Sequence, residues 1–349
     1  MTALLCVETM NLDDIVTISP KAAVTGEATI NLAAGEKIKV RHLLMALLMN
    51  SANDAATAIA EACAGDYASF IAMMNGRAAE LGLKDTHFTN PHGLHNDDHY
   101  SSADDLAHLA RAAMSHEQIR KITNTERAVI PWPGKQWDRQ LVNRNRLLPQ
   151  WPEADGVKTG YTRQAGRCLV ASATVNGWRL LAVCLDCKDS WVDGRALLEW
   201  GFDNYVQAVP VRQGMPATCE VRKGTRKTVR VAATQQLALP VRRDQPPLKP
   251  TLDLPPAEAP IAPGQQLGYV WVAYRGVEYC IPLVAAEAVE KSLWARCVDS
   301  YMPAGLLLLL MALSVGVLVH GASAKIALSR RRRLAQRRRR VDSGRPRRG

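Results

Sequence analysis

The chain has 349 residues, 47% of them hydrophobic, which is ordinary for a globular protein with room for two domains and an appendage. The net charge of +11 suggests nucleic-acid binding, but twelve basic residues and one acidic residue lie between positions 325 and 349. Residues 1–324 therefore carry no net charge, and the basic character belongs to the tail alone. This distribution argues against a nucleic-acid partner.

The first third of the chain is predicted to be largely helical. Residues 1–7 are apolar and lack a cap, so we interpret them as the remnant of a helix. Residues 40–50 and 54–64 are rich in helix-forming residues, and Ser51-Ala52-Asn53 lies between them. A small hydroxyl and an amide displayed between two apolar helices suit a functional site better than a core.

Two further helices are predicted before residue 115. Residues 66–81 carry phenylalanine and methionine at helical spacing, so this stripe is expected to lie in the core. Ser102 and Asp105 fit a capping box at the start of a helix over residues 103–114. The acids in its first turn favour the helix dipole and are expected to be structural rather than catalytic.

Histidines and cysteines raise the question of a metal or redox site. The loop over residues 90–99 carries His92, His95 and His99 beside two aspartates, but their spacing fits no common helical zinc motif. Cys184 and Cys187 have C-x-x-C spacing without a second pair, and the eight cysteines show no disulfide framework. We therefore expect buried thiols, no metal and no cofactor.

The middle of the chain is predicted to form a sheet. Residues 168–173 and 180–185 are apolar strands joined at Asn176-Gly177, a signature of a hairpin turn. Residues 153–156 are predicted to form a turn that leads into Lys158-Thr159-Gly160. A lysine, a hydroxyl and a glycine beside a sheet make an anion-binding edge that a ligand can approach closely.

The composition changes after residue 209. Short strands are predicted at residues 219–221, 228–231 and 237–241, and a hairpin at Arg275-Gly276. The proline-rich stretch 245–264 is predicted to be a loop. We expect a small β domain that acts as a spacer, since no chemistry is evident in it.

The C-terminal segment is predicted to lie in a membrane. Residues 301–323 carry no charge and are long enough to span a bilayer. Two arginine clusters follow in the tail 325–349, which marks the cytoplasmic side of a transmembrane helix. We expect membrane lipids as partners and a protein body outside the cytoplasmic membrane.

Ser51-Ala52-Asn53 and Lys158-Thr159-Gly160, in this order, resemble the S-x-N and K-T-G motifs of the penicillin-binding-protein and serine β-lactamase superfamily. The closer resemblance is to the low-molecular-weight D-alanyl-D-alanine carboxypeptidases, strong over about residues 1–205 and weak beyond. Further matching stretches are residues 35–37, 51–56, 90–94, 99–107, 143–148, 155–162 and 165–170. Residues 194–202 look like the family's closing helix, so a helix that ends at Gly201 is expected to close the first domain.

This resemblance implies an α/β (α+β) domain with an antiparallel sheet and a helical cluster over residues 1–206. A small β-rich domain over 207–292 and the predicted membrane helix would follow. The implied reaction is removal of the terminal D-alanine from peptidoglycan stem pentapeptides through an acyl-enzyme. β-Lactams would be covalent inhibitors. The β domain and anchor argue against the related β-lactamase activity.

The resemblance also implies a role for each motif residue. Ser51 would relay a proton toward the leaving amine, and Asn53 would bind the substrate's backbone amide and help orient the catalytic lysine. Lys158 would keep the local field positive. Thr159 would bind the terminal carboxylate, and the Tyr161 backbone N–H, which follows Gly160, would supply one oxyanion donor.

One part of the family pattern does not occur in these 349 residues. The family's nucleophilic serine and its lysine, in the motif S-x-x-K, precede a helix that looks like residues 1–5, and this chain contains no S-x-x-K. No signal peptide is evident either. We expect that Met1 is an internal methionine of a longer protein. The alternative is an inactive, membrane-anchored relative that binds peptidoglycan without cleaving it.

Overall fold

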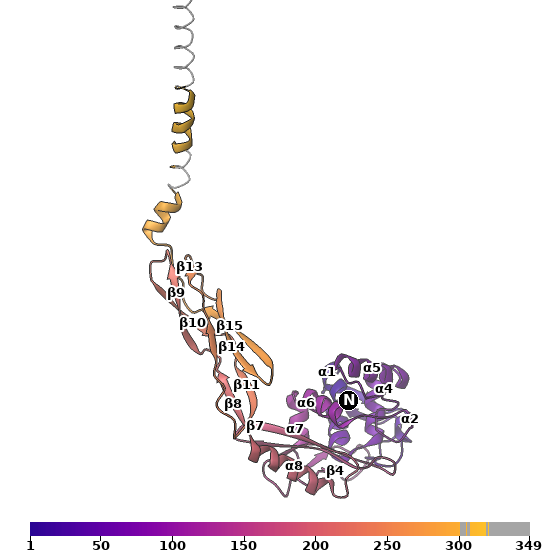
Figure 1. Cartoon of the computed structure of the whole chain (residues 1–349). Coiled ribbons are helices and arrows are strands. Elements are labelled where there is room, and N and C mark those ends of the chain that lie inside the picture. Colours follow the sequence, from indigo (N-terminus) through magenta and orange to yellow (C-terminus); the bar gives the residue numbers. More distant parts are fainter. Residues whose placement is uncertain (301–304, 306–307, 319, 321–349) are drawn as a thin grey trace, which may run out of the picture. The chain divides into compact units, whose positions relative to one another are not determined.

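A computed structural model describes residues 1–300, 305, 308–318 and 320. The chain divides into two compact units. The first comprises residues 1–207 and 241–245, and the second comprises residues 208–240 and the chain from residue 246 onward. Figure 1 labels the elements of both units.

The first unit contains a helical cluster and an antiparallel sheet (Figure 1). Its helical elements are α1 (Thr2–Thr9), α2 (Pro20–Ala23), α3 (Val40–Met45), the π-helical turn η1 (Ala46–Asn50), α4 (Asn53–Ala64), α5 (Tyr67–Glu80), α6 (Ala103–Ala113), α7 (Glu117–Thr123) and α8 (Ser190–Asn204). Its strands are β1 (Ile15–Thr17), β2 (Lys37–Lys39), β3 (Arg127–Ile130), β4 (Arg139–Val142), β5 (Ala154–Thr162), β6 (Gly166–Val175) and β7 (Trp178–Cys184).

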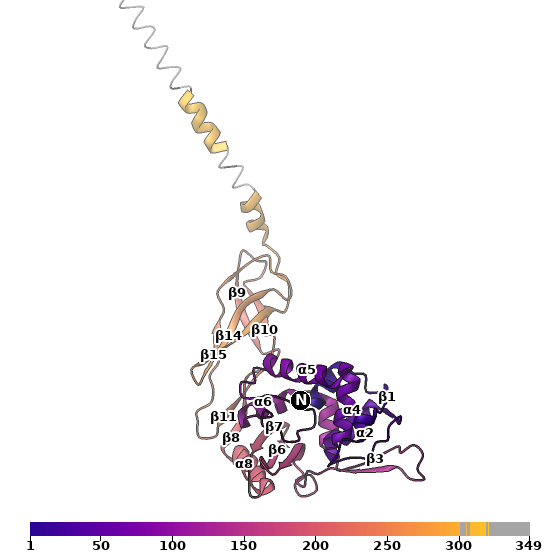
Figure 2. The same ribbon diagram turned by 90° about the vertical axis from the view of Figure 1, so that its right-hand side faces the viewer.

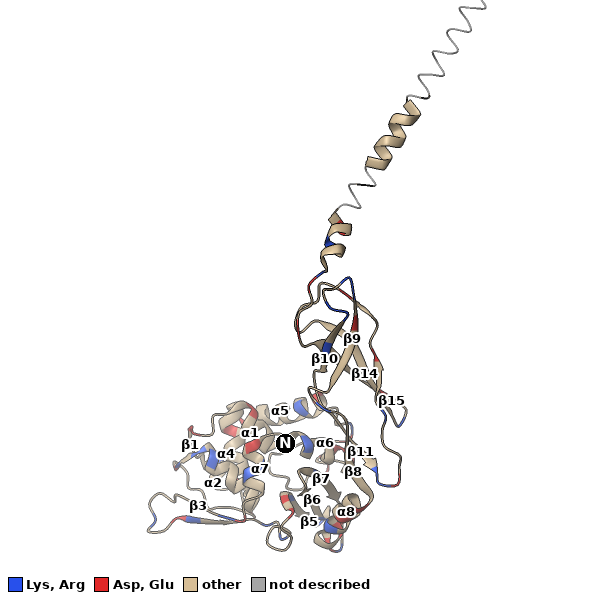
Figure 3. Ribbon diagram, turned by 90° about the vertical axis from the view of Figure 1, so that its left-hand side faces the viewer, with Lys and Arg blue, Asp and Glu red and all other residues tan. Residues whose placement is uncertain are grey.

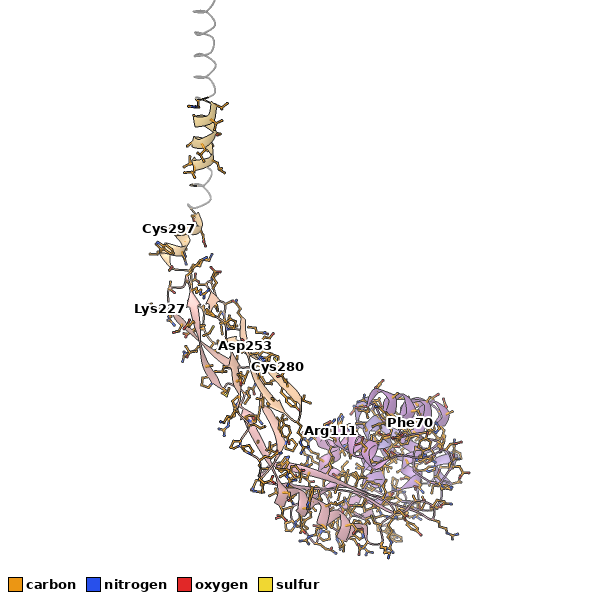
Figure 4. The ribbon with its side chains drawn as sticks, in the orientation of Figure 1. Phe70, Arg111, Lys227, Asp253, Cys280 and Cys297 are labelled. Carbon is orange, nitrogen blue, oxygen red and sulfur yellow. The ribbon has the colours of Figure 1, made fainter. Side chains whose placement is uncertain are left out.

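The helical cluster is built around α4 and α5, as their apolar stripes predict. Phe70 of α5 is fully buried among residues of α1, α4 and α6 (Figure 4). Asp66 caps α5 by accepting a hydrogen bond from the Ser69 N–H at 2.9 Å. The cap and the buried stripe together place α5 against α4.

Only half of the predicted capping box forms at α6. The Ser102 hydroxyl accepts a hydrogen bond from the Asp105 N–H, as predicted. The Asp105 carboxylate, however, does not reach back to Ser102. It accepts hydrogen bonds from the backbone N–H groups of Lys84 and Asp85 and from the Thr86 hydroxyl. Asp105 therefore ties the start of α6 to the preceding loop, and these bonds lower the pKa of its carboxyl group.

Strands β5, β6 and β7 form a three-stranded antiparallel sheet in that order, and α8 packs against β6 and β7 (Figure 2). The hairpin between β6 and β7 is confirmed, with positive φ angles of 51° at Asn176 and 78° at Gly177. Close packing of α8 requires Gly194, because a Cβ there would lie 2.9 Å from Leu169 Cδ2.

Two predicted boundaries in this region are wrong. The predicted turn over residues 153–156 is present only at Glu153, and β5 begins at Ala154, because Asp155 is buried and accepts hydrogen bonds from Ser172, Thr174 and Arg179. Contacts with distant strands thus override the local turn preference. Helix α8 also does not end at Gly201 but continues to Asn204, in a place where a Cβ at Gly201 would meet Leu180 at 2.7 Å.

The second unit is mainly β structure up to residue 292, and its described residues from 293 onward are helical. A six-stranded sheet has the order β12-β14-β15-β10-β9-β13. Its strands are β9 (Pro216–Arg222), β10 (Thr228–Ala233), β12 (Thr251–Asp253), β13 (Ala257–Glu258), β14 (Gln266–Tyr274) and β15 (Val277–Ala285). Strands β8 (Tyr205–Val211) and β11 (Leu237–Arg242) form a two-stranded ribbon, and each contains residues of both units.

The hairpin at Arg275-Gly276 joins β14 and β15 as predicted, with positive φ at both turn residues. Cys280 of β15 pairs with Trp271 of β14 in this hairpin (Figure 4). The proline-rich stretch 245–264 is not wholly a loop, because β12 pairs with β14 and β13 pairs with β9. These short edge strands add to a sheet that already exists, which explains why their own sequence signal is weak.

Among the described residues, no helix combines the length and the apolarity needed to cross a membrane. The predicted spanning segment, residues 301–323, is described only at positions 305, 308–318 and 320. The basic tail 325–349 lies wholly outside the described residues. Over the described part of the chain, acidic and basic residues are interspersed rather than gathered in one basic stripe (Figure 3).

Candidate active site

Ser51 lies at a strained corner between two helices, as the sequence predicts. Helix α3 continues into η1, and α4 begins two residues after Ser51. Ser51 adopts the left-handed conformation, with φ 57° and ψ 39°. Such angles are uncommon for a residue other than glycine, and both strained residues and π-helical turns are frequent at functional sites.

Asn53 is buried beside this corner as the first residue of α4. Its backbone N–H donates to the Ala28 carbonyl at 2.7 Å, and its Nδ2 donates to the Gly26 carbonyl at 2.9 Å. The adjacent Asp54 accepts backbone hydrogen bonds from Ile30 and Leu32. Burial raises the pKa of the Asp54 carboxyl group, with these hydrogen bonds opposing the shift. The loop before β2 therefore fixes the corner.

Lys158 of β5 reaches this corner from 107 residues away. Its Nζ donates to the Ser51 Oγ at 2.8 Å and to the Thr159 carbonyl at 2.8 Å. Burial lowers the pKa of Lys158 to about 8, and the nearby Arg144 guanidinium adds to this shift. The fold thus brings together the two motifs, and the lysine there loses its proton at a lower pH than an ordinary lysine does.

Thr159, Gly160 and Tyr161 lie toward the exposed end of β5, which is an edge strand of its sheet. A Cβ at Gly160 would lie 3.8 Å from the Cys168 Cβ, an ordinary contact, so packing within the chain does not require glycine here. Tyr161 is 70% exposed. An edge strand with a small residue and free backbone groups suits an extended peptide.

Two histidines of the loop over residues 90–99 make hydrogen bonds within the protein, and of the two C-x-x-C thiols Cys184 is buried whereas Cys187 is half-buried. His92 Nε2 lies 3.3 Å from the Tyr67 hydroxyl, and His99 Nδ1 accepts from the Thr89 N–H. In the part of the chain that the structure describes, no group of three or more potential ligands could hold a metal ion. Burial raises the pKa of Cys184 to about 11, and the pKa of Cys187 is also raised by burial, so neither thiol is readily ionised.

Several residues that link the two motifs have no role predicted from the sequence. Arg144 donates a hydrogen bond to Met49 of η1, and Asn145 donates one to Gly156 of β5. Arg139 forms a buried ion pair with Glu36 beneath the loop that fixes Asn53. The N-x-N spacing was visible in the sequence, whereas nothing local pairs Arg139 with a residue 103 positions away.

Known proteins resemble this chain over most of its length. Residues 1–189 match the family described as D-alanyl-D-alanine carboxypeptidase, and residues 209–291 match the C-terminal domain of penicillin-binding protein 5. The chain is 34% identical over 307 residues to D-alanyl-D-alanine carboxypeptidase DacF of Bacillus subtilis, covering 84% of this chain and 78% of DacF. It is 33% identical over 307 residues to DacD of Escherichia coli, covering 83% and 77%.

Solved structures show the same relation. Penicillin binding protein 5 from Haemophilus influenzae is 28% identical, with a TM-score of 0.66 and coverage of 83% of this chain and 89% of that chain. The Streptomyces K15 DD-transpeptidase is 31% identical, with a TM-score of 0.55, covering 58% of this chain and 84% of that chain. The first unit therefore has the α/β fold of penicillin-binding proteins and β-lactamases, and a small β domain follows it.

Proposed function

Because the chain belongs to the D-alanyl-D-alanine carboxypeptidase family of serine-type, low-molecular-weight penicillin-binding proteins, we propose that its two motifs form the substrate-binding side of a peptidase site. The observation that carries this proposal is the contact of 2.8 Å between Lys158 Nζ and Ser51 Oγ. It joins S-x-N and K-T-G in one hydrogen-bonded unit at the edge of a sheet.

The proposed substrate is a peptidoglycan stem peptide that ends in D-Ala-D-Ala. Its extended backbone would pair with the edge of β5, and its terminal carboxylate would accept hydrogen bonds from Thr159 and face the Lys158 ammonium group. Gly160 leaves space for the close approach. The Tyr161 N–H would donate to the oxygen of the reacting carbonyl as negative charge develops there.

In the proposed reaction the family's S-x-x-K serine attacks the carbonyl of the penultimate D-alanine. The carbon–nitrogen bond breaks, and the leaving amine takes a proton through the Ser51 hydroxyl, which Lys158 holds in place. Water then hydrolyses the ester and restores the serine. Residues 1–349 contain no S-x-x-K, so activity should be measured on the product of the complete reading frame, including any codons upstream of Met1.

Asn53 is assigned a more limited role than its motif alone suggests. One of its two Nδ2 hydrogens is held by the Gly26 carbonyl, which orients the carboxamide, and its Oδ1 is an acceptor that can bind the substrate or the catalytic lysine. An acceptor suits both the peptide N–H of a substrate and an ammonium group. We assign Asn53 Oδ1 to these two partners.

The proposal extends to the surroundings of the protein. β-Lactams would acylate the same serine, and the apolar segment 301–323 would anchor the chain in the membrane lipids with the arginine-rich tail on the cytoplasmic side. The peptidase unit would then act outside the cytoplasmic membrane. The sequence of that segment supports the anchor, because it is uncharged over its length.

The direct test uses two peptides that differ only at the C-terminus. The complete protein is expected to release D-alanine from an acyl-L-Lys-D-Ala-D-Ala peptide and to act at least about 100-fold more slowly on the C-terminal amide, because the amide lacks the negative charge that Thr159 and Lys158 would bind. Equal rates on both peptides would contradict the carboxylate assignment. Absence of release together with absence of covalent labelling by a fluorescent penicillin would favour the non-catalytic alternative.

Binding of the acidic peptide should weaken as the pH rises through about 8. Lys158 carries its charge below the lowered pKa and loses it above, so the attraction to a carboxylate is present at pH 7 and lost by pH 9 to 10. Titration calorimetry of the peptide between pH 6.5 and 9.5 tests this. Lys158→Arg, whose charge persists, should remove the pH dependence; a wild-type affinity that is flat over this range would contradict the assignment.

A further inference from the structure

We propose that the segment Asn143–Asn145, here called the strap, sets the distance between the two halves of the site, with Asn145 as the positioning residue for Lys158. This inference rests on the proposed function, because it names the residues that hold the proposed site in register. The strap follows β4 and crosses from η1 to β5.

On one side the strap holds the Ser51 corner. The Arg144 N–H donates to the Met49 carbonyl at 3.1 Å. Met49 lies in η1, is fully buried, and precedes Ser51 by two residues. Because η1 is the last turn before the strained Ser51, a bond to its final carbonyl groups fixes where that serine points.

On the other side the strap holds β5. Asn145 Nδ2 donates to the Gly156 carbonyl at 2.9 Å, and Gly156 precedes Lys158 by two residues in the strand. Asn145 is 2% exposed, and its Oδ1 accepts from the Leu147 N–H at 3.1 Å. Both polar atoms of the buried carboxamide are therefore hydrogen-bonded, one to the strand and one to its own loop.

The strap is itself anchored. Asn143 Nδ2 donates to the carbonyl groups of Thr123 and Thr125 at the end of α7, and its Oδ1 accepts from the Asn145 N–H at 2.9 Å. The Asn143 N–H donates to the Glu126 carbonyl at 2.8 Å. Because the backbone and the side chain of Asn143 are both hydrogen-bonded, we expect the strap to stay in place and to fix the position of β5.

The opposite side of β5 is closed at the same residue. A Cβ at Gly156 would lie 2.9 Å from Ser172 Oγ and 3.2 Å from Thr123 Oγ1. Gly156 is thus enclosed on its side-chain side and hydrogen-bonded to Asn145 through its carbonyl. Loss of the Asn145 donor removes a hydrogen bond from a buried carbonyl two residues before Lys158, and a shift of the strand in response would move Lys158.

The test compares Asn145→Ala with Asn75→Ala in the complete protein. Asn75 is a matched control, because it makes the same two backbone bonds, to Phe88 N and O at 2.8 Å each, far from the site. Both variants should lose stability. Only Asn145→Ala should lower kcat for D-alanine release and the penicillin acylation rate, by about 10- to 100-fold.

A second readout separates positioning from simple destabilisation. The Lys158 pKa, followed by the ¹⁵N shift of its Nζ in labelled chain 1–349, should move from about 8 toward the ordinary lysine value in Asn145→Ala and stay unchanged in Asn75→Ala. Asn145→Ser, which keeps a donor, should restore part of both signals and replaces Asn145→Ala if that variant does not fold. Equal behaviour of the Asn145 and Asn75 variants would overturn the inference. If the wild-type protein released no D-alanine, the proposed function would be overturned, and the titration of Lys158 in the two variants would still test the role of the strap.

Discussion

Lys158→Ala is expected to reduce D-alanine release from a D-Ala-D-Ala peptide by about 10²- to 10³-fold or more, the loss typical of removing one preorganised electrostatic group from an acyl-transfer site. Lys158 contributes twice: its Nζ holds the Ser51 hydroxyl at 2.8 Å, and its charge faces the proposed carboxylate position. The measurement is kcat/KM for D-alanine release, with covalent penicillin labelling as an independent readout.

The same substitution should not destabilise the fold through its charge. The folded-state pKa of Lys158, about 8, lies below the ordinary value of 10.5, so folding disfavours the ammonium form at neutral pH. The unfolded chain binds more protons between these two values, and stability contributed by Lys158 therefore rises as pH increases from 8 to 10.5. Lys158→Ala removes this dependence.

A matched control is Lys121→Ala. Lys121 is an exposed residue of α7 that pairs with Glu117, and its loss should change neither activity nor folding appreciably. Unchanged D-alanine release in a folded Lys158→Ala protein would contradict the assignment of K-T-G to the site. If Lys158→Ala lowered the melting temperature so far that the protein was unfolded in the assay, the loss of activity would instead reflect a structural role of the lysine.

What the sequence predicts well here depends on local signals. The corner at Ser51 follows from two adjacent helix-forming stretches, and the hairpins at Asn176-Gly177 and Arg275-Gly276 follow from residues that accept positive φ. The helices predicted between residues 40 and 114 have the right bounds within a few residues, because caps such as Asp66 act within one turn. The family motifs supply the two halves of the proposed site.

What the sequence does not reveal depends on contacts between distant positions. Asp155 looks like a turn residue until Ser172, Thr174 and Arg179 surround it. Asn145 looks like a loop residue until its carboxamide is seen to join β5. Local propensity is a weak prior in both cases, because a buried carboxylate or amide is placed by its partners.

Arg139→Ala should be the most destabilising single change predicted for the first unit, by about 3–5 kcal/mol in the free energy of unfolding. The Arg139 and Glu36 side chains are only 3% and 5% exposed, and two nitrogens of Arg139 bond the two Glu36 oxygens at 2.7 and 2.8 Å. Removing the arginine leaves a buried carboxylate without its cation.

Arg139 also holds the loop that carries Asn53's partners. It donates to the carbonyl groups of Ile30 and Asn31, whose neighbours Gly26 and Ala28 bind Asn53. The Trp132 ring lies 4.6 Å from the Arg139 guanidinium carbon and covers it. A urea titration of Arg139→Ala should therefore show a lower unfolding midpoint. The folded fraction of this variant should also bind the peptide more weakly than the wild-type protein does.

The controls separate the pair from its surroundings. Arg195→Ala, in the exposed pair with Glu199, should cost no more than about 1 kcal/mol. The double change Arg139→Met with Glu36→Leu should recover most of the stability, because an apolar pair does not leave a charge unpaired. If Arg139→Ala cost as little as Arg195→Ala, the buried pair would not be what fixes this loop. Recovery of stability without recovery of peptide affinity would show that the loop carbonyl groups, rather than the ion pair, set the position of Asn53.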